Sequence, residues 1–508
     1  MFKRFLSVGG FTLLSRLTGF ARDMLLAWML GGGLISDAFF VAFVFPNNFR
    51  AIFGEGTINP AFLPRYAALH ARGEYAKAAR FADAVFSWQI AAQILLLAAA
   101  IIFMPGIIRL LAPGFAANPV QFALTVSLAR VTFPYLILTL VAVQLSAMLN
   151  TIEKFWAAAA WSNLLNLSMI ATLICWRWFP NAAYAAAWGV LLGGVAQLVF
   201  ITWAASREGL RLKLSWPRWS AEIKEFFIAF GAVTIGAGSV VILPFIDTII
   251  ASLLPTGSRT ALYYADRINQ LPLGVLGIAL GTVLLPEMSR RLARGDSAGS
   301  NAAQNRSAAT SLLLTLPFAA VFLAIPGTIM RAVFAHGAFH TGAAMLAATA
   351  LAAYGAGLPA MALVRIVAST FYARHDTLTP ARATVTAIIV NIILKVIFVW
   401  GFHLGVAGVA LGTALGAWIN VGLLTWFGHS RALLAIEKAF VKALPPVLIA
   451  AIATGAAAWA GAWMAAPLLP GRLTDVAALA GAITLGTLAY GMVVWIFRRA
   501  LPLGKFAQ

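Results

Sequence analysis

Charged residues are scarce in this chain, and acids are the scarcest: Asp and Glu number 16, against 36 Lys and Arg. Only 10% of the 508 residues are charged and 62% are hydrophobic, whereas soluble domains carry about 25% charged residues. This shortage excludes an ordinary soluble domain and indicates a membrane protein. The net charge of +20 would suggest nucleic acid as the partner of a soluble protein, but in a membrane protein it reflects the sidedness of the loops. We therefore expect no nucleic-acid partner.

Cysteine is nearly absent as well. Cys175 is the single one, so neither a disulfide framework nor a cysteine-based metal site is possible. The sequence also lacks H-E-x-x-H, G-x-x-x-x-G-K-[ST] and G-x-S-x-G patterns. We expect a transporter rather than an enzyme, without a cofactor or a bound metal. Without an ATP site, transport would depend on an ion gradient or on membrane voltage, which is worth about 2.3 kcal/mol per charge per 100 mV.

Long apolar runs dominate what is present. A membrane span needs about 20 mainly apolar residues, and by that rule we count fourteen helices, which predicts an all-α polytopic membrane protein. Their approximate ranges are 5–30, 34–54, 79–104, 121–149, 155–178, 182–205, 222–253, 260–288, 307–328, 342–372, 380–402, 405–427, 441–466 and 474–497. Arg16 and Arg22 interrupt the first run and no A-x-A-like site follows it, so we expect this run to stay as a helix rather than to be cleaved as a signal peptide.

When successive loops are assigned alternately to the two sides of the membrane, most of the basic residues fall on one side. Of the 36 Lys and Arg, 24 lie in the loops of one side, 5 lie on the other side, and 7 lie inside predicted spans. Because cytoplasmic loops are enriched in Lys and Arg, this bias places both termini in the cytoplasm. A wrong helix count would have mixed the two sides, so the segregation supports fourteen spans independently of hydropathy.

An internal repeat divides the chain. LPRYAALHARGE at 63–74 matches LPEMSRRLARGD at 285–296, at an offset of 222 residues. Six spans per repeat is an even number, so the two halves have the same orientation, as in parallel repeats related by an axis along the membrane normal. We predict an N-lobe at 1–206, a C-lobe at 221–428, and two additional helices at 441–499. Two such lobes would enclose a central cleft.

Ionisable residues interrupt the first two predicted spans. An arginine at the bilayer centre costs about 2.5–3.5 kcal/mol even on lenient scales, so each needs a partner. Arg16 and Asp23 are seven residues apart and share one helix face, which favours their pairing and leaves Arg22 a weaker claim on that acid. Spacing gives no dedicated acid to Arg22, Arg50 or Arg267.

Two readings of these arginines stay open. In the first, Asp23, Asp37, Glu55 and Asp266 neutralise them in a buried network. In the second, the guanidinium forks, which match phosphate oxygens, hold a diphosphate between the lobes. The amides of Asn47 and Asn48 would then add neutral donors.

The motifs SRLTGFARDMLLAWMLGGGLISDAFFVAF, FPNNFRAIFGEG, YYADR and LGIALGTVLLP resemble the MurJ (MviN) lipid II flippases of the MOP transporter superfamily. The resemblance covers essentially the whole chain. It implies a MOP/MATE-like fold with two six-helix lobes. The implied activity is translocation of undecaprenyl-diphosphate-linked peptidoglycan precursor to the periplasmic leaflet of the bacterial inner membrane, by alternating access of a central cationic cavity. The implied partners are lipid II and membrane lipids, with the monomer as the functional state, and residues 441–499 would form a groove for the lipid tail.

The resemblance also implies a set of central substrate-binding residues. They are Ser15, Arg16, Arg22, Asp37, Asn47, Arg50, Glu55 and Arg267. Among them, Arg22, Arg50 and Arg267 resemble a diphosphate clamp. Lys395 departs from members that are thought to bind sodium through acids at this helix, so we expect no sodium dependence.

Two alternatives are weaker. One is a related MOP exporter of drugs or of other polyprenyl-linked glycans, although drug exporters favour acidic cavities and this chain has an excess of arginine. The other is a membrane glycosyltransferase that uses polyprenyl diphosphates. It would need an acidic motif in a long outer loop, and no predicted outer loop is long enough.

Overall fold

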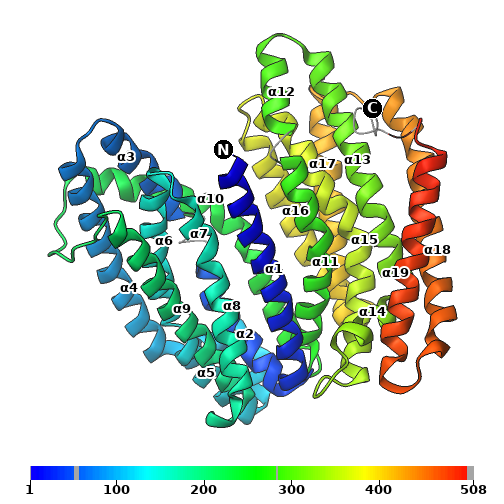
Figure 1. The fold of residues 1–508 in the computed structure, drawn as a ribbon, viewed down its shortest axis with the longest axis horizontal. Helices are drawn as coiled ribbons and strands as arrows, with labels where there is room; N and C mark the ends of the chain where they lie inside the picture. The colour runs from blue at the N-terminus through cyan, green and yellow to red at the C-terminus, as the bar shows by residue number, and fades with distance from the viewer. Residues whose placement is uncertain (1, 51–56, 282–283, 500, 502–508) are drawn as a thin grey trace. The chain divides into compact units, whose positions relative to one another are not determined.

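The computed structural model describes residues 2–50, 57–281, 284–499 and 501 (Figure 1). These residues form helices joined by short connections, with no strand among them. Within them, ten helical stretches are long and apolar enough to cross a membrane, and Leu34–Phe49 and Ile242–Ser252 are shorter apolar helices. The prediction of an all-α polytopic membrane protein is confirmed.

The chain divides into two compact units. Unit 1 contains Met1–Arg259 and Gly337–Phe339, and unit 2 contains Thr260–His336 and His340–Gln508. The elements of unit 1 are α1 (Phe2–Leu30), α2 (Leu34–Phe49), α3 (Asn59–Ala71), α4 (Tyr75–Leu111), η2 (Pro113–Ala117), α5 (Pro119–Thr132), α6 (Tyr135–Thr151), α7 (Phe155–Ala160), α8 (Ser162–Ile174), η3 (Trp176–Trp178), α9 (Ala182–Arg207) and α10 (Ala221–Ser252). Those of unit 2 are α11 (Ser258–Gly281, which enters unit 2 at Thr260), α12 (Leu284–Ala293), α13 (Ser297–Ala324), α14 (Pro326–Phe334), α15 (Thr341–Tyr372), α16 (Leu378–Val396), η4 (Ile397–Gly401), α17 (Gly405–Ser430), α18 (Lys438–Ala465), η5 (Ala466–Leu468), η6 (Gly471–Leu473) and α19 (Thr474–Ile496).

The helices follow the apolar runs of the sequence. Each of the fourteen predicted ranges is largely helical where it is described. Three ranges are interrupted at described residues, at Phe133–Pro134 between α5 and α6, at Trp161 between α7 and α8, and at Ile325 between α13 and α14. The prediction missed α3 and α14, because they have only 13 and 9 residues and are too short for the criterion of about 20 apolar residues.

Helix α10 packs within unit 1, although the repeat made it the first helix of the C-lobe. The ring of Phe226 meets that of Phe81 of α4 at 6.5 Å, and the ring of Phe227 meets that of Trp88 at 6.0 Å, both edge to face. Edge-to-face pairs of this kind stabilise helix contacts beyond the area that they bury. The division into an N-lobe, a C-lobe and two additional helices describes the repeat, which these contacts do not test, and it stays a prediction.

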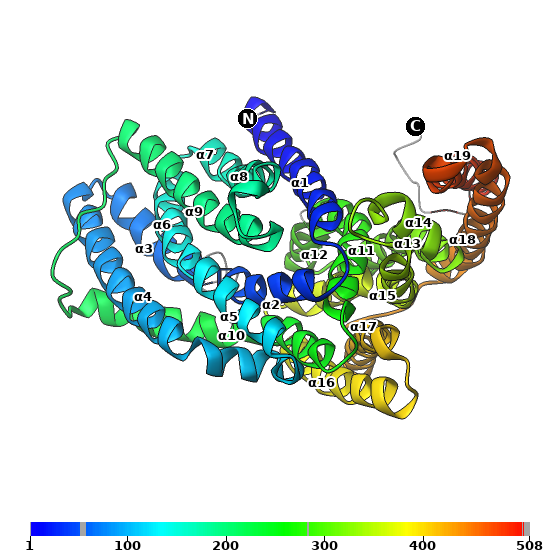
Figure 2. The same ribbon diagram turned by 90° about the horizontal axis from the view of Figure 1, so that it is seen from below.

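The last two long helices of unit 2, α18 and α19, run side by side (Figure 2). They approach closely because glycines face each other: a Cβ added to Gly481 would lie 2.4 Å from the carbonyl oxygen of Gly461 and 2.4 Å from the Cβ of Ala465. Small residues at such a crossing replace the hydrophobic driving force that is absent between helices in lipid.

Replacing Gly481 by alanine should therefore force α18 and α19 apart. Overpacking of this kind costs about 1–3 kcal/mol, so we expect a lower melting temperature in detergent. Gly491→Ala on the same helix is the matched control, because nothing lies within 4 Å of a Cβ added there. A Gly481→Ala variant that melts no lower than Gly491→Ala would contradict this packing.

A polar cluster fastens the connection between α15 and α16. Asp376 accepts hydrogen bonds from the Thr379 hydroxyl at 2.6 Å and from the Thr379 N–H at 2.9 Å. Arg431, at the end of α17, donates to the same carboxylate at 3.2 Å. The hydrogen bonds from Thr379 and then the charge of Arg431 hold the pKa of Asp376 below its ordinary value. The ionised carboxylate thus links α15, α16 and α17.

Asp376→Asn should lower the melting temperature, because capping interactions of this kind contribute about 1 kcal/mol. A depressed folded-state pKa means that the stabilisation is complete above the unfolded pKa of about 3.9 and is lost as the pH falls through the folded pKa. We expect the difference between the parent and the variant to stay constant from about pH 5 to pH 7 and to shrink below about pH 4. A difference that grows with acid would have the wrong sign.

Candidate substrate-binding site

Arg22 lies on α1 and is held by two partners. Its Nε and Nη2 donate to Asp23 Oδ1 at 3.0 and 2.7 Å, and its Nη1 donates to Asn166 Oδ1 of α8 at 2.9 Å. Arg22 is 6% exposed and Asp23 is 3% exposed. Removing two charges from water is costly unless the pair is close and further hydrogen bonds complete it. The amide of Asn166 provides that completion, so the guanidinium has one fixed orientation.

Asn166 connects this pair to the rest of α1. Its Nδ2 donates to the Ser15 carbonyl and to the Thr18 hydroxyl, both at 3.1 Å. Gly19 allows this approach, because a Cβ there would already lie 3.4 Å from Asn166 Nδ2. One amide therefore joins about two turns of α1, from Ser15 to Arg22, to α8.

The expectation for Arg22 is wrong: spacing left Arg22 without a dedicated acid, but Asp23 forms an ion pair with Arg22. The reason is the length of the arginine side chain, which lets the guanidinium fold back onto its sequence neighbour when Asn166 holds its other end. The pairing of Arg16 with Asp23 stays a prediction. Arg16 is exposed and Ser15 is half-buried. Of the predicted site residues that the structure describes, Ser15 and Arg22 share a partner, Asn166.

Asn163 and Asn166 are site residues that the sequence did not predict. Asn163 is also buried, and its Oδ1 accepts a hydrogen bond from the Thr18 hydroxyl at 3.4 Å. A signal was available: two amides three residues apart share one face of an apolar span, and polar side chains inside membranes mark functional or packing contacts.

Asp37, near the start of α2, holds a turn. It is 2% exposed, and its Oδ2 accepts a hydrogen bond from the Gly257 N–H at 2.6 Å. Gly257 has a φ of +96°, and a Cβ there would lie 2.6 Å from the Gly32 carbonyl oxygen, so only glycine fits. These contacts give Asp37 a positioning role, and direct contact with a substrate stays a prediction.

The carboxyl end of α2 carries Asn47, Asn48 and Arg50. Asn47 and Arg50 are half-buried, whereas Asn48 is 9% exposed, and its Nδ2 has no hydrogen-bond partner among the described residues. The rings of Phe45 and Phe49 stack at 5.0 Å and fix this end of the helix. Glu55, which follows in the chain, lies outside the described residues.

Arg267 lies on α11 in unit 2. Its Nη2 donates to the hydroxyl of Tyr263 at 3.1 Å, and its guanidinium carbon lies 4.8 Å from the centre of that ring. This cation–π contact holds the guanidinium against the helix while its surface stays half-exposed. Gln270, one turn further along α11, donates to Asp266.

Lys395 on α16 is fully buried. Its stem packs against α17 where Gly412 leaves room, since a Cβ there would lie 2.5 Å from Lys395 Cγ. In the part of the chain that the structure describes, no group of three or more His, Cys, Asp and Glu side chains could hold a metal ion. The absence of sodium dependence stays a prediction.

Solved structures show which known fold this protein has. One of them is an inward-facing multidrug resistance MATE family transporter of the MOP superfamily. Its superposition on this protein covers 82% of this chain and 95% of the transporter's chain, with a TM-score of 0.70 and 16% identity. The chain therefore has the fold of a MOP superfamily transporter. A second solved structure is a lipid II flippase MurJ in an inward closed conformation. Its superposition covers 97% of this chain and 98% of the flippase chain, with a TM-score of 0.79 and 24% identity.

Sequence relatives then identify the family. The family model described as lipid II flippase MurJ matches residues 26–487. A probable lipid II flippase MurJ of Rhizobium meliloti is 37% identical over 92% of this chain and 88% of its own length. A lipid II flippase MurJ of Burkholderia cenocepacia is 32% identical over 84% of this chain and 83% of its own length. The chain belongs to the lipid II flippase MurJ family, which confirms the resemblance seen in its motifs.

Proposed function

We propose that this protein moves lipid II, the undecaprenyl-diphosphate-linked peptidoglycan precursor, from the cytoplasmic to the periplasmic leaflet of the bacterial inner membrane. The observation that carries the proposal is the family match over residues 26–487, together with relatives named as lipid II flippases over most of their length. The protein would act as a monomeric transporter with both termini in the cytoplasm, and without catalysing a covalent step.

The arginines of the predicted site, which the family resemblance assigns, are suited to a diphosphate ligand. Arg16 is exposed, and Arg50 and Arg267 are half-exposed, on helices of a membrane protein. Guanidinium forks bind phosphate oxygens in a bidentate manner. We assign Arg16, Arg50 and Arg267 to the diphosphate. Arg22 would serve as a donor of fixed orientation, because Asp23 already balances its charge.

The remaining predicted residues would support this site. Ser15 shares Asn166 with Arg22, and Asp37 fixes the Gly257 turn, so both would act by positioning. Asn47 would add an amide donor, and Glu55 is assigned only by the family resemblance. Alternating access, driven by an ion gradient or by voltage, would carry the headgroup across.

Reconstitution tests the proposal. The purified full chain in liposomes should move fluorescently labelled lipid II to the opposite leaflet, where a membrane-impermeant quencher can reach it. An equally labelled phosphatidylcholine should stay in its leaflet. Sodium gradients, proton gradients and voltage are then imposed one at a time. No movement of lipid II under any condition, or equal movement of both lipids, would refute a lipid II flippase.

A further inference from the structure

The connection between α9 and α10, residues 209–220, is held in a defined path although it contains no helix or strand. Its backbone is fastened to α4 at two points: the Lys213 N–H donates to Asp83 Oδ1 at 2.8 Å, and the Ser215 N–H donates to Ser87 Oγ at 3.0 Å. We call residues 209–220 the strap. Side chains that a fixed backbone presents to solvent are preorganised for a partner.

Aromatic contacts fasten the end of the strap. Trp88 of α4 donates its Nε1–H to the Arg218 carbonyl at 3.1 Å. The ring of Trp219 stacks on Phe227 of α10 at 5.6 Å and meets the edge of Trp88 at 5.5 Å. The strap therefore cannot swing away from α4 without breaking these contacts.

Two large apolar side chains remain outside this packing. Trp216 is 83% exposed and Leu214 is 68% exposed. Neighbouring residues of the strap are fixed, so this exposure is built into the fold. Tryptophan with an exposed ring is typical of the boundary between lipid and water, where its apolar body and its N–H are both satisfied.

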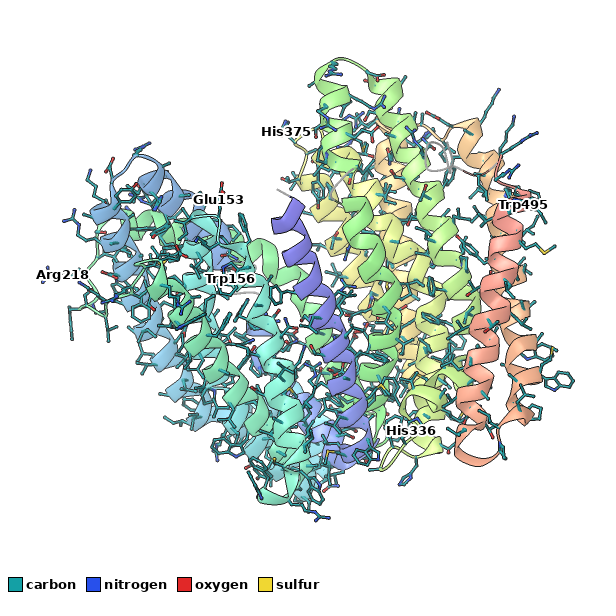
Figure 3. The ribbon with its side chains drawn as sticks, in the orientation of Figure 1. Glu153, Trp156, Arg218, His336, His375 and Trp495 are labelled. Atoms are coloured by element: carbon teal, nitrogen blue, oxygen red, sulfur yellow. The ribbon has the colours of Figure 1, made fainter. Side chains whose placement is uncertain are left out.

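The charge of the strap has one sign. Arg211, Lys213 and Arg218 are exposed, residues 209–220 include no acid, and none of the three takes part in an ion pair among the described residues. The side chain of Arg218 projects outward in Figure 3. Of the nearest acids, Glu208 pairs with Lys154 and Glu225 pairs with Arg65, while Asp83 accepts the Lys213 N–H. Glu222 is the one exposed acid beside the strap without an ion-pair partner in the described part of the chain.

We propose that the strap binds the headgroups of anionic phospholipids, with Trp216 and Leu214 at the level of the headgroups and Arg211, Lys213 and Arg218 on the phosphates. Basic residues at a negatively charged bilayer surface each contribute about 1 kcal/mol, which corresponds to about fivefold in affinity. Tryptophan adds the interfacial contact that a purely basic loop lacks. The strap would then fix the start of α10 at the membrane surface in a manner that depends on the lipid composition. This inference is independent of the transported substrate.

The test measures which lipids surround the strap in the full-length protein. Cys175 is replaced by alanine, Leu214→Cys carries a bimane fluorophore, and the protein is placed in phosphatidylcholine nanodiscs. Spin-labelled phosphatidylglycerol or spin-labelled phosphatidylcholine is then added at equal amounts. We expect phosphatidylglycerol to quench the fluorophore at least about threefold more strongly than phosphatidylcholine.

Two triple variants separate the strap from general electrostatics. The first triple variant combines Arg211→Gln, Lys213→Gln and Arg218→Gln. In this variant, the ratio of quenching by phosphatidylglycerol to quenching by phosphatidylcholine should fall to about one. The control removes the same charge at three exposed arginines of unit 2, as Arg290→Gln with Arg294→Gln and Arg306→Gln, and should leave the ratio unchanged. Equal quenching by the two lipids with the strap intact would overturn the proposal, as would an equal effect of the two triple variants. Accessibility to aqueous iodide without quenching by either lipid would indicate a soluble partner instead, and would also overturn it.

Discussion

Charge reversal of Arg50 or of Arg267 is expected to abolish lipid II transport while the protein still inserts and folds. A guanidinium that binds a phosphate oxygen at about 4 Å gains about 4 kcal/mol at an effective dielectric constant near 20, and a carboxylate at the same place loses as much. Since 1.4 kcal/mol is a factor of about ten, the activity in liposomes should fall by more than about a hundredfold in Arg50→Glu and in Arg267→Glu. The initial rate of lipid II movement is the measurement.

Graded substitutions show whether charge or geometry matters. Arg50→Lys keeps the charge and loses the bidentate fork, so it should retain part of the activity, whereas Arg50→Gln should lose about tenfold or more. Arg130→Gln is the control. Arg130 is exposed on α5, donates to the Ile101 carbonyl at 3.2 Å, and has no role in the proposed site. Full transport by both charge-reversed variants at normal expression would exclude the diphosphate assignment.

The fold was predictable because one physical rule dominates it. Apolar runs of about 20 residues become helices in lipid, since every backbone polar group must be paired within the segment. The rule says nothing of shorter elements, and so it missed α3 and α14. Nor does it decide which long helix packs with which. The repeat assigns α10 to the C-lobe, which stays a prediction, and the rule does not show that α10 packs in unit 1 through contacts such as that between Phe226 and Phe81.

The candidate site was predictable in part. Charges in apolar runs identified Arg22 and Asp37 as residues that need partners, and both have them. The identity of those partners could not follow from local spacing. Asp37 binds the backbone of Gly257, which is 220 residues away, and Arg22 binds Asn166, which is 144 residues away. Such pairs depend on how the helices of unit 1 pack, and helical periodicity describes only one helix at a time.

The contacts of Arg22 lead to the second large prediction. Asp23→Asn removes a carboxylate that forms an ion pair with the buried Arg22, and breaking a buried pair costs about 3–5 kcal/mol. Asn166→Leu leaves the guanidinium without its amide acceptor and the Ser15 carbonyl without its side-chain donor, at about 1–3 kcal/mol for each unsatisfied group. We expect a lower melting temperature for both variants, and transport reduced at least tenfold by the loss of a fixed Arg22.

Asn163→Leu separates orientation from general damage to α8. It is the same substitution one turn away, at a residue that is equally buried and that contacts Thr18 rather than Arg22. Because its hydrogen bonds, at 3.2 to 3.4 Å, are longer than the contact between Arg22 and Asn166, we expect a loss of about 1 kcal/mol in stability and nearly normal transport by the protein that remains folded. Melting temperatures in detergent and transport rates per folded molecule are measured for both variants. If Asn163→Leu and Asn166→Leu lose transport equally, α8 contributes packing alone and the orientation of Arg22 is not what transport requires. A selective loss in Asn166→Leu would mean that the amide acts through the guanidinium that it holds.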